Sequence, residues 1–284
     1  MKRGLVLEGG AMRGMFTCGV IDVMMENNIN FDGIVGVSAG AAFGCNYKSN
    51  QIGRGIRYNM QFCNDKRYCS ISSLIRTGNL YNADFCYKVV PTEYDKFDYK
   101  AFYENPMDFV AVCMDIETGK PYYKHFDKEE ENMFEWFRAS ASLPLVSQIV
   151  EIGDKKLLDG GIVDSIPIKY FESIGYDRNV VVLTQPKDYV KKKQKSMQLV
   201  KRVYKKYPKL VEAMSNRHIM YNDTLEYIKK REKEGSTLVI RPKEDLKIGR
   251  TEKNPEELKR VYEIGRKTCE EQIENIRKFI ENND

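Results

Sequence analysis

Short apolar runs alternate with amphipathic stretches along the first two thirds of the chain. Six runs have the length and composition of strands, at residues 4–8, 31–37, 109–114, 121–126, 156–158 and 179–184. Three stretches carry apolar or small residues at helical spacing, at residues 15–27, 39–45 and 168–174. Because strands alternate with helices, we predict an α/β fold with a mostly parallel sheet and helices on both of its faces.

The pattern changes after Pro186, where the chain becomes charged and helical. Asn254 is followed by a proline and two glutamates, which is a typical helix start, and apolar residues then recur on one helix face as far as Ile280. The sequence contains no internal repeat and no Gly/Ser-rich linker. We therefore expect residues 1–185 to form one α/β domain, and residues 186–284 to form a charged helical extension, or cap, packed on it.

Composition narrows the class of protein. The 284 residues are 42% apolar and 31% charged, which excludes a disordered chain. The longest apolar run, at residues 109–114, is far shorter than the roughly 20 residues that cross a bilayer, and Glu8 interrupts the N-terminus before a signal peptide could develop. The seven cysteines lack metal-ligand spacing, so we expect reduced thiols, with Cys18 and Cys113 in the core, and no metal. A soluble cytoplasmic protein is the resulting expectation.

The net charge of +5 conceals a strongly basic segment between Lys187 and Lys209. This segment holds ten Lys/Arg and one acid, and its apolar residues, among them Met197, Val200 and Tyr204, recur at helical spacing. A basic helix of this kind can lie at the inner surface of an anionic membrane as a peripheral contact. It can equally be a solvated face whose apolar stripe packs on the domain. Nucleic acid is not an expected partner, since no recognised motif accompanies the charge.

A Gly-x-Ser-x-Gly pentapeptide stands where a predicted strand meets a predicted helix. It comprises Gly36, Val37, Ser38, Ala39 and Gly40. A serine on such a tight turn projects its hydroxyl, small neighbours leave room for a reacting carbonyl, and the positive end of the helix points at it. Ser38 is therefore a candidate nucleophile, although a plain strand–turn–helix junction with a serine cap would show the same pattern.

A glycine-rich turn follows the first predicted strand, and it contains Gly9, Gly10, Ala11, Arg13 and Gly14. Such a turn before a helix can present backbone N–H groups to an oxygen that becomes negative during acyl transfer. The dinucleotide-binding pattern is not met, because Ala11 occupies the position of a required glycine, and the chain has no P-loop. We expect an oxyanion hole here and no cofactor.

Asp159, Gly160 and Gly161 directly follow the predicted strand at residues 156–158. An aspartate at a strand end, beside glycines that let another backbone approach, is placed to accept a proton from a serine. Asp-Gly is also a common signal for a simple turn. Beside the serine and glycine motifs, Asp159 becomes the candidate base.

Only two histidines are present, His125 and His218. The order Ser38, Asp159, His218 copies that of the α/β-hydrolase triad. Two observations oppose this triad: the serine turn follows only two predicted strands, and His218 lies in a basic helical segment instead of a loop after a strand. His125 lies in a predicted strand and suits packing or a surface hydrogen bond. We therefore expect catalysis that does not depend on histidine.

The three motifs, in this order, resemble the patatin-like phospholipase family. Supporting similarity lies at residues 112–119, 138–144 and 159–167, and the resemblance covers about residues 4–185. The chain departs from the family's pattern at Ala11, where a glycine is usual. If the turn needs a left-handed conformation there, alanine would be strained by about 1–2 kcal/mol.

The resemblance implies a three-layer patatin-like sandwich and a serine–aspartate dyad that cleaves fatty-acyl esters of lipids through an acyl-enzyme, without metal or cofactor. Ser38 would attack the ester, Asp159 would accept the proton, Gly10 and Ala11 would hold the oxyanion, and Arg13 would shape the turn. Three residues are candidates to line the pocket for the apolar chain: Tyr81, Phe85 and Tyr87. Two alternatives stay open: an acyltransferase with the same dyad, and a catalytically weak lipid-binding protein of the same fold.

Overall fold

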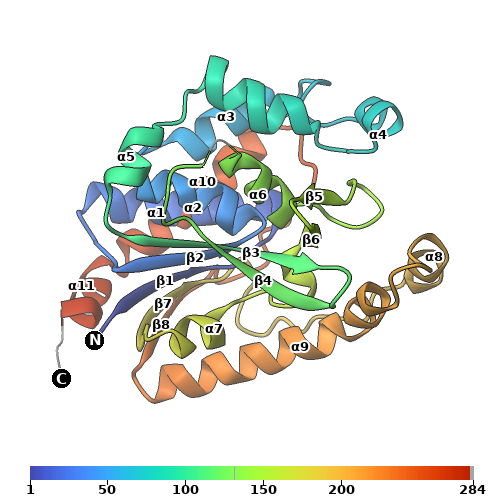
Figure 1. The fold of residues 1–284 in the computed structure, drawn as a ribbon. Helices are drawn as coiled ribbons and strands as arrows, with labels where there is room; N and C mark the ends of the chain where they lie inside the picture. The colour runs from blue at the N-terminus through green and yellow to red at the C-terminus, as the bar shows by residue number, and fades with distance from the viewer. Residues whose placement is uncertain (131, 282–284) are drawn as a thin grey trace.

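A mixed sheet runs through the middle of the computed structural model, which describes residues 1–130 and 132–281 (Figure 1). Five neighbouring strands are parallel, in the order β3 (Asp108–Asp115), β2 (Gly33–Val37), β1 (Arg3–Leu7), β7 (Arg178–Val182) and β8 (Thr237–Ile240). Three further strands join the sheet through antiparallel pairs: β4 (Lys120–His125) and β6 (Lys155–Asp159) pair with β3, and β5 (Val150–Ile152) pairs with β6. The mostly parallel sheet is the one that the sequence predicts.

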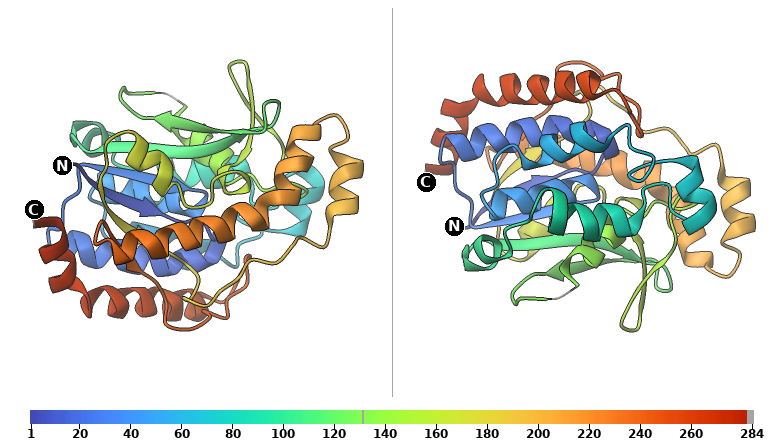
Figure 2. Two further views of the ribbon diagram at one scale, coloured as in Figure 1. Left: turned by 90° about the horizontal axis from the view of Figure 1, so that it is seen from below. Right: turned by 90° about the horizontal axis from the view of Figure 1, so that it is seen from above.

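Helices cover both faces of this sheet (Figures 1 and 2). Successive side chains of a strand face opposite sides, so that Leu5 and Leu7 of β1 enter one apolar core and Val6 enters another. The first core is closed by α1 (Gly14–Glu26), α2 (Ala39–Lys48), α3 (Arg54–Phe62), α5 (Tyr99–Glu104), α6 (Met133–Ser140) and α10 (Pro255–Glu270). The second is closed by α7 (Ile168–Ser173) and α9 (Pro208–Lys233). These layers confirm the predicted sandwich.

The C-terminal region is mainly helical, as predicted, but it also supplies β8, a strand that the sequence analysis did not predict. In this region α10 lies along α1 with the two backbones in contact. A Cβ on Gly19 would overlap the carbonyl oxygen of Tyr262, and a Cβ on Gly265 would overlap that of Phe16. Glycine at both positions therefore lets the two helices approach each other closely.

The helix predicted from Asn254 almost to the C-terminus is instead two helices. A turn at Glu271 and Gln272 separates α10 from α11 (Ile273–Glu281). This turn redirects the chain so that Ile276 and Ile280 bury in the same core as α10. The prediction of one continuous helix was wrong, because helical spacing alone does not reveal a short break.

The basic segment between Lys187 and Lys209 is less helical than predicted. Residues 187–196 contain no helix, α8 spans only Met197–Val203, and Pro208 opens α9 instead of continuing α8. The apolar stripe of the segment packs inward, since Met197, Val200 and Tyr204 are buried in a small apolar cluster.

Cys18 and Cys113 are buried in the core, as predicted. Within the described residues, no helix has the length and apolar character needed to span a bilayer. The same residues include no group of three or more histidine, cysteine, aspartate or glutamate side chains that could hold a metal ion.

Candidate active site

Ser38 occupies a strained turn between β2 and α2. Its backbone angles, φ 55° and ψ −121°, belong to a region that side-chain-bearing residues rarely adopt, at a cost of about 1–3 kcal/mol. Gly40 lets the start of α2 approach the end of β1 directly, because a Cβ there would overlap the carbonyl oxygen of Leu7. A Cβ on Gly36 would collide with the backbone of Ala41 in the same way. Both predicted glycines thus allow the tight turn that holds Ser38.

Ser38 and Asp159 come together because two strands end head to head along β3. The register of β2 places Val37 opposite Val112, after which β2 ends. The antiparallel β6 approaches from the other direction and ends with Asp159 opposite Cys113, the next residue of β3. Gly160 then passes directly against β3, where a Cβ would overlap the carbonyl oxygen of Val112. Adjacent positions on one strand therefore place the serine beside the aspartate.

Ser140, at the end of α6, forms hydrogen bonds at the point where β2 and β6 meet along β3. Its hydroxyl donates to the carbonyl oxygen of Val112 at 2.6 Å and accepts the backbone N–H of Ser38 at 2.8 Å. The backbone N–H of Asp159 donates to the carbonyl oxygen of nearby Ser142 at 2.8 Å. Ser140 was not predicted as a site residue, although it lies within residues 138–144, one of the blocks that resemble the family.

The Asp159 carboxylate is almost fully buried and hydrogen-bonded. It accepts the backbone N–H of Gly161 at 2.7 Å and is also bonded by the Ser38 hydroxyl. Burial raises the pKa of Asp159, while the positive charge of Arg217 and the two hydrogen bonds oppose that rise. The carboxylate is therefore a stronger base than a free aspartate, and it contacts the hydroxyl whose proton it would accept.

The glycine turn lies beside Ser38 and is anchored through Glu8. The buried Glu8 carboxylate accepts the backbone N–H of Thr184 at 2.6 Å, its hydroxyl at 3.1 Å, and the hydroxyl of Tyr221 at 2.6 Å. Four of the predicted turn residues face the same small cavity as Ser38, namely Gly9, Gly10, Ala11 and Arg13, while Gly14 begins α1. The end of β7 and helix α9 thus fix the turn in place.

Ala11 adopts the left-handed conformation, with φ 49°. The cost of about 1–2 kcal/mol for an alanine in this conformation therefore applies to Ala11.

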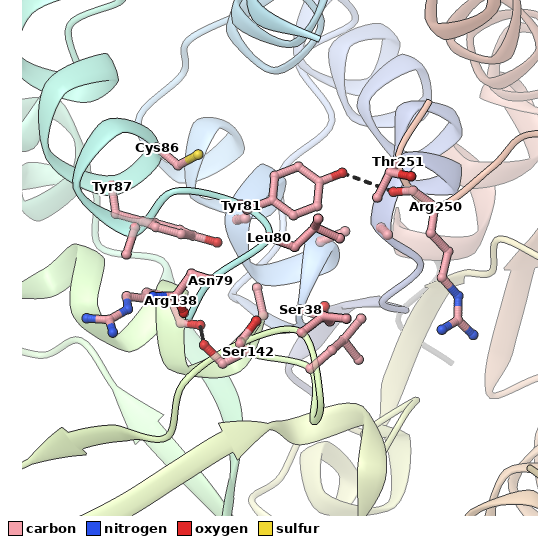
Figure 3. Close-up of a pocket in the computed structure, with 18 of the residues that line it drawn as sticks. Ser38, Asn79, Leu80, Tyr81, Cys86, Tyr87, Arg138, Ser142, Arg250 and Thr251 are labelled. Carbon is pink, nitrogen blue, oxygen red and sulfur yellow. Dashed lines mark hydrogen bonds between the residues drawn. The ribbon is translucent and has the colours of Figure 1, made fainter. Parts of the chain in front are cut away.

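An apolar cavity of about 240 Å³ opens on one side of Ser38 (Figure 3). Tyr81 and Tyr87 line it, as predicted, and the Tyr81 hydroxyl donates to the carbonyl oxygen of Arg250 at 3.0 Å. The same prediction for Phe85 was wrong, since this ring packs against Phe62 with 5.2 Å between the ring centroids. Phe85 and Tyr87 lie in the same π-helix, Phe85–Tyr94, where side chains two positions apart point in opposite directions.

A second cavity, polar and about 50 Å³ in volume, opens on the other side of Ser38. Its lining includes the carboxylates of Glu8 and Asp159 and four basic side chains, those of Arg13, Lys191, Arg217 and Arg250. Ala11, Ser38, Leu143 and Arg250 line both cavities, so the serine lies at their boundary. Lys191, Arg217 and Arg250 were not predicted as site residues, because no local pattern indicates which lysines or arginines turn inward.

Neither histidine is among the residues that line the two cavities within the described chain. His125 in β4 forms a hydrogen bond of 2.7 Å between its Nε2 and the Tyr170 hydroxyl. His218 directly follows Arg217 on α9, and one step along a helix turns a side chain by about 100°. The positions of both residues agree with a mechanism that does not use them.

The family model described as patatin-like phospholipase matches residues 5–172, and the chain belongs to this family. A second model, described as a domain of unknown function (DUF6363), matches residues 207–281. The family is one of lipid hydrolases by its description.

Individual relatives are distant. The chain is 28% identical over 195 residues to the uncharacterized protein YjjU of Escherichia coli, a match that covers 64% of this chain and 52% of that protein. It is 26% identical over 187 residues to lysophospholipase NTE1 of Chaetomium globosum, which covers 61% of this chain and 11% of that enzyme. The chain thus spans about half, or much less, of the length of these relatives. VipD of Legionella pneumophila aligns with a TM-score of 0.49 and 13% identity over 96% of this chain and 67% of that chain.

Replacing Ala11 by glycine should raise the free energy of unfolding by about 1 kcal/mol, because glycine adopts this φ without the cost that alanine has. Urea unfolding of Ala11→Gly and the wild type measures the difference. The matched control is Ala101→Gly in helix α5, which should lower the free energy of unfolding by about 1 kcal/mol. Equal destabilisation by both substitutions would contradict a strained alanine in the turn.

Proposed function

We propose that the protein is a serine acyl hydrolase that cleaves fatty-acyl esters of lipids with a dyad of Ser38 and Asp159. The observation that carries this proposal is the contact between a serine on a strained strand-to-helix turn and a buried carboxylate, at the mouth of an apolar cavity. Membership of the patatin-like phospholipase family, and similarity to a protein named lysophospholipase, support a lipid ester as the substrate.

The reaction begins with proton transfer from the Ser38 hydroxyl to Asp159 as the serine Oγ attacks the ester carbonyl carbon. The carbonyl oxygen becomes negative, and we expect the backbone N–H groups of Gly10 and Ala11, two residues that line the cavity beside Ser38, to stabilise it. The carbon–oxygen bond of the ester then breaks, the alcohol leaves with the proton from Asp159, and the acyl group stays on Ser38. Water attacks this acyl-enzyme and gives a proton to Asp159, which returns it to Ser38 as the fatty acid departs.

A carboxylate can act as this base because its surroundings change its proton affinity. Free aspartate has a pKa of about 3.9, well below the value of about 6.5 for histidine. Burial raises the pKa of Asp159 and makes it a better proton acceptor, while the charge of Arg217 opposes that rise. A weak base lowers the activation barrier less than a strong base does. Two further effects must therefore lower it: hydrogen bonds to the oxyanion, and the positive end of the helix dipole at the start of α2.

Replacing Asp159 by asparagine should lower kcat/KM for a p-nitrophenyl fatty-acyl ester by about 10²–10⁴-fold, since the general base is lost while the shape of the side chain is kept. His218→Ala and His125→Ala should each stay within about twofold of the wild type. Circular dichroism confirms that each variant is folded. A folded His218→Ala protein that has lost activity would overturn the dyad in favour of a triad.

We also propose that the enzyme meets its lipid at an anionic membrane surface, through the outward side of the segment between Lys187 and Lys209. Leu199 and Val203 of α8 are 50% and 53% exposed, and basic side chains surround them. Helix α4 (Ile71–Thr77), with Ile71 and Ile75 more than 70% exposed, lies at the same end of the molecule (Figures 1 and 2). Exposed apolar side chains beside lysines suit the headgroup region of anionic lipids.

The loop between α6 and β5, residues 141–149, connects this surface to the active site. The carbonyl oxygen of Val146 accepts the backbone N–H of Leu80, which follows α4, and the backbone N–H of Leu145 donates to the Tyr204 hydroxyl, which follows α8. Leu143 and Val146 of the same loop line the apolar cavity. A lipid at this surface would therefore lie beside the entrance to Ser38.

The double substitution Leu199→Asp/Val203→Asp should weaken binding to phosphatidylglycerol vesicles by about tenfold, because it adds negative charge and removes apolar contact. Co-sedimentation measures the binding. Ile52→Asp is the matched control, since Ile52 is 42% exposed and lies beyond the end of α2 opposite to Ser38. The proposed membrane contact would be contradicted if the wild type did not sediment with these vesicles, or if Ile52→Asp weakened vesicle binding as much as the double substitution.

A further inference from the structure

The apolar cavity extends from Ser38 to a wall that separates it from a third, smaller cavity. At one end it borders the polar cavity, and the residues that line both of these cavities include Ser38. At the other end it borders a cavity of about 30 Å³, and four residues line both: Ala42, Tyr58, Cys86 and Tyr87 (the last two are labelled in Figure 3). We call these four residues the end wall. Because Ser38 would hold the ester, the end wall is what the far end of an acyl chain would meet.

The volume of the apolar cavity limits how much of an acyl chain it can hold. A protein cavity of about 150 Å³ binds benzene, which has six carbon atoms. In the same proportion, the 240 Å³ of this cavity would hold about ten carbon atoms. The third cavity, of about 30 Å³, would add only about one more. A chain of about fourteen carbons would therefore not fit unless the end wall moved.

A buried, hydrogen-bonded arginine lies behind the end wall. The guanidinium carbon of Arg54 is 5.3 Å from the centre of the Tyr58 ring, which lies over it. Arg54 donates to the backbone carbonyl oxygen of Asp95 at 2.7 Å and to the side chain of Asn46 at 3.0 Å. It also lines the third cavity. An acyl chain that passed Tyr58 would bring hydrocarbon against this charged side chain, which is unfavourable.

Tyr87 belongs to the π-helix Phe85–Tyr94, a rare type of helix that often occurs at functional sites. Phe85 fixes the start of this helix, because its ring packs edge-on against Phe62 in the core. Within the part of the chain that the structure describes, the Tyr87 hydroxyl forms no hydrogen bond. Removal of the Tyr87 ring would therefore leave no polar partner unsatisfied, and it would join the apolar cavity to the third cavity.

We propose that the end wall restricts the enzyme to esters of medium-chain acids, with about ten carbons or fewer, and that Tyr87 sets this limit. The inference rests on the proposed function. With the ester at Ser38, the acyl chain occupies the apolar cavity and its last carbons contact Tyr87. Tyr58 is the less adaptable part of the wall, since it covers the buried charge of Arg54.

The test measures kcat/KM for p-nitrophenyl esters whose acyl chains increase from about four to about fourteen carbons, all at one mole fraction in neutral detergent micelles. In the wild type, kcat/KM should rise up to about ten carbons, by at most about fourfold per methylene, and then fall at least about tenfold. Tyr87→Ala should move the optimum to longer chains, and Ala42→Leu, which fills the cavity at the end wall, should move it to shorter ones. Tyr94→Ala is the matched control, because it removes a tyrosine ring from the same π-helix but from outside both cavities as the described residues define them.

The control should keep the wild-type optimum, and circular dichroism confirms that each variant is folded. A wild type that hydrolyses the longest ester as fast as that of about ten carbons would overturn the proposal. An optimum that stays in place in folded Tyr87→Ala would do the same. If Tyr87→Ala does not fold, Ala42→Leu decides, and an unchanged optimum in that variant would overturn the proposal.

Calorimetric binding of saturated fatty acids to Ser38→Ala separates the end wall from the chemistry. The affinity should increase about fourfold with each added methylene up to about ten carbons, and should then stay level or fall. If the wild type hydrolyses none of the esters and this limit persists, the hydrolase proposal fails and the limit set by the end wall stands. An affinity for Ser38→Ala that keeps rising to about fourteen carbons would show that the chain passes the end wall, and it would overturn the proposal whatever the hydrolytic activity.

Discussion

The pairing of β3 with two other strands along one edge is the constraint on which the site depends. β2 runs parallel to β3 and stops opposite Val112, while β6 runs antiparallel and stops opposite Cys113. A slip of one residue in either register would turn its side chains to the opposite face of the sheet and separate Ser38 from Asp159. Ser140 bonds both sides of this meeting point, and the buried sheet around it holds the strained serine turn.

The C-terminal region takes part in this site as well as in the fold. Residues beyond the patatin-like match at 5–172 supply β8, the tyrosine that fixes Glu8, and three of the four basic side chains in the polar cavity. Side chains of the basic segment after Pro186 thus point in two directions. Lys191 turns inward to the cavity, while Leu199, Val203 and the lysines around them face outward. An apolar cavity thus lies on one side of Ser38, and a polar cavity with several basic side chains lies on the other.

Local patterns in the sequence were enough to predict the central strands, the serine turn and the aspartate. Each depends on residues adjacent in the chain, such as Gly36 and Gly40 around Ser38. Features that depend on distant packing were not predictable in the same way. β8 is a short run within a charged region, and its place in the sheet depends on pairing with β7. Arg217 reaches Gly161 only because α9 crosses the second face, and Ser140 matters only because β2 and β6 end beside it. The basic segment between Lys187 and Lys209, predicted to be helical, has no helix before Met197, because composition and spacing do not reveal the hydrogen bonds between Lys191 and Asn222.

The most direct test of a serine activated by Asp159 is the rate at which a fluorophosphonate labels Ser38 as a function of pH, with the labelled peptide identified by mass spectrometry. Labelling requires the ionised base, so the rate should rise with pH through a single ionisation. Because burial raises the pKa of Asp159, the midpoint should lie above the usual aspartate value of about 3.9. Asp159→Asn should remove this rise, and His218→Ala should leave it in place. Absence of labelling in the folded wild type, or a pH profile that His218→Ala abolishes and Asp159→Asn does not, would contradict the account.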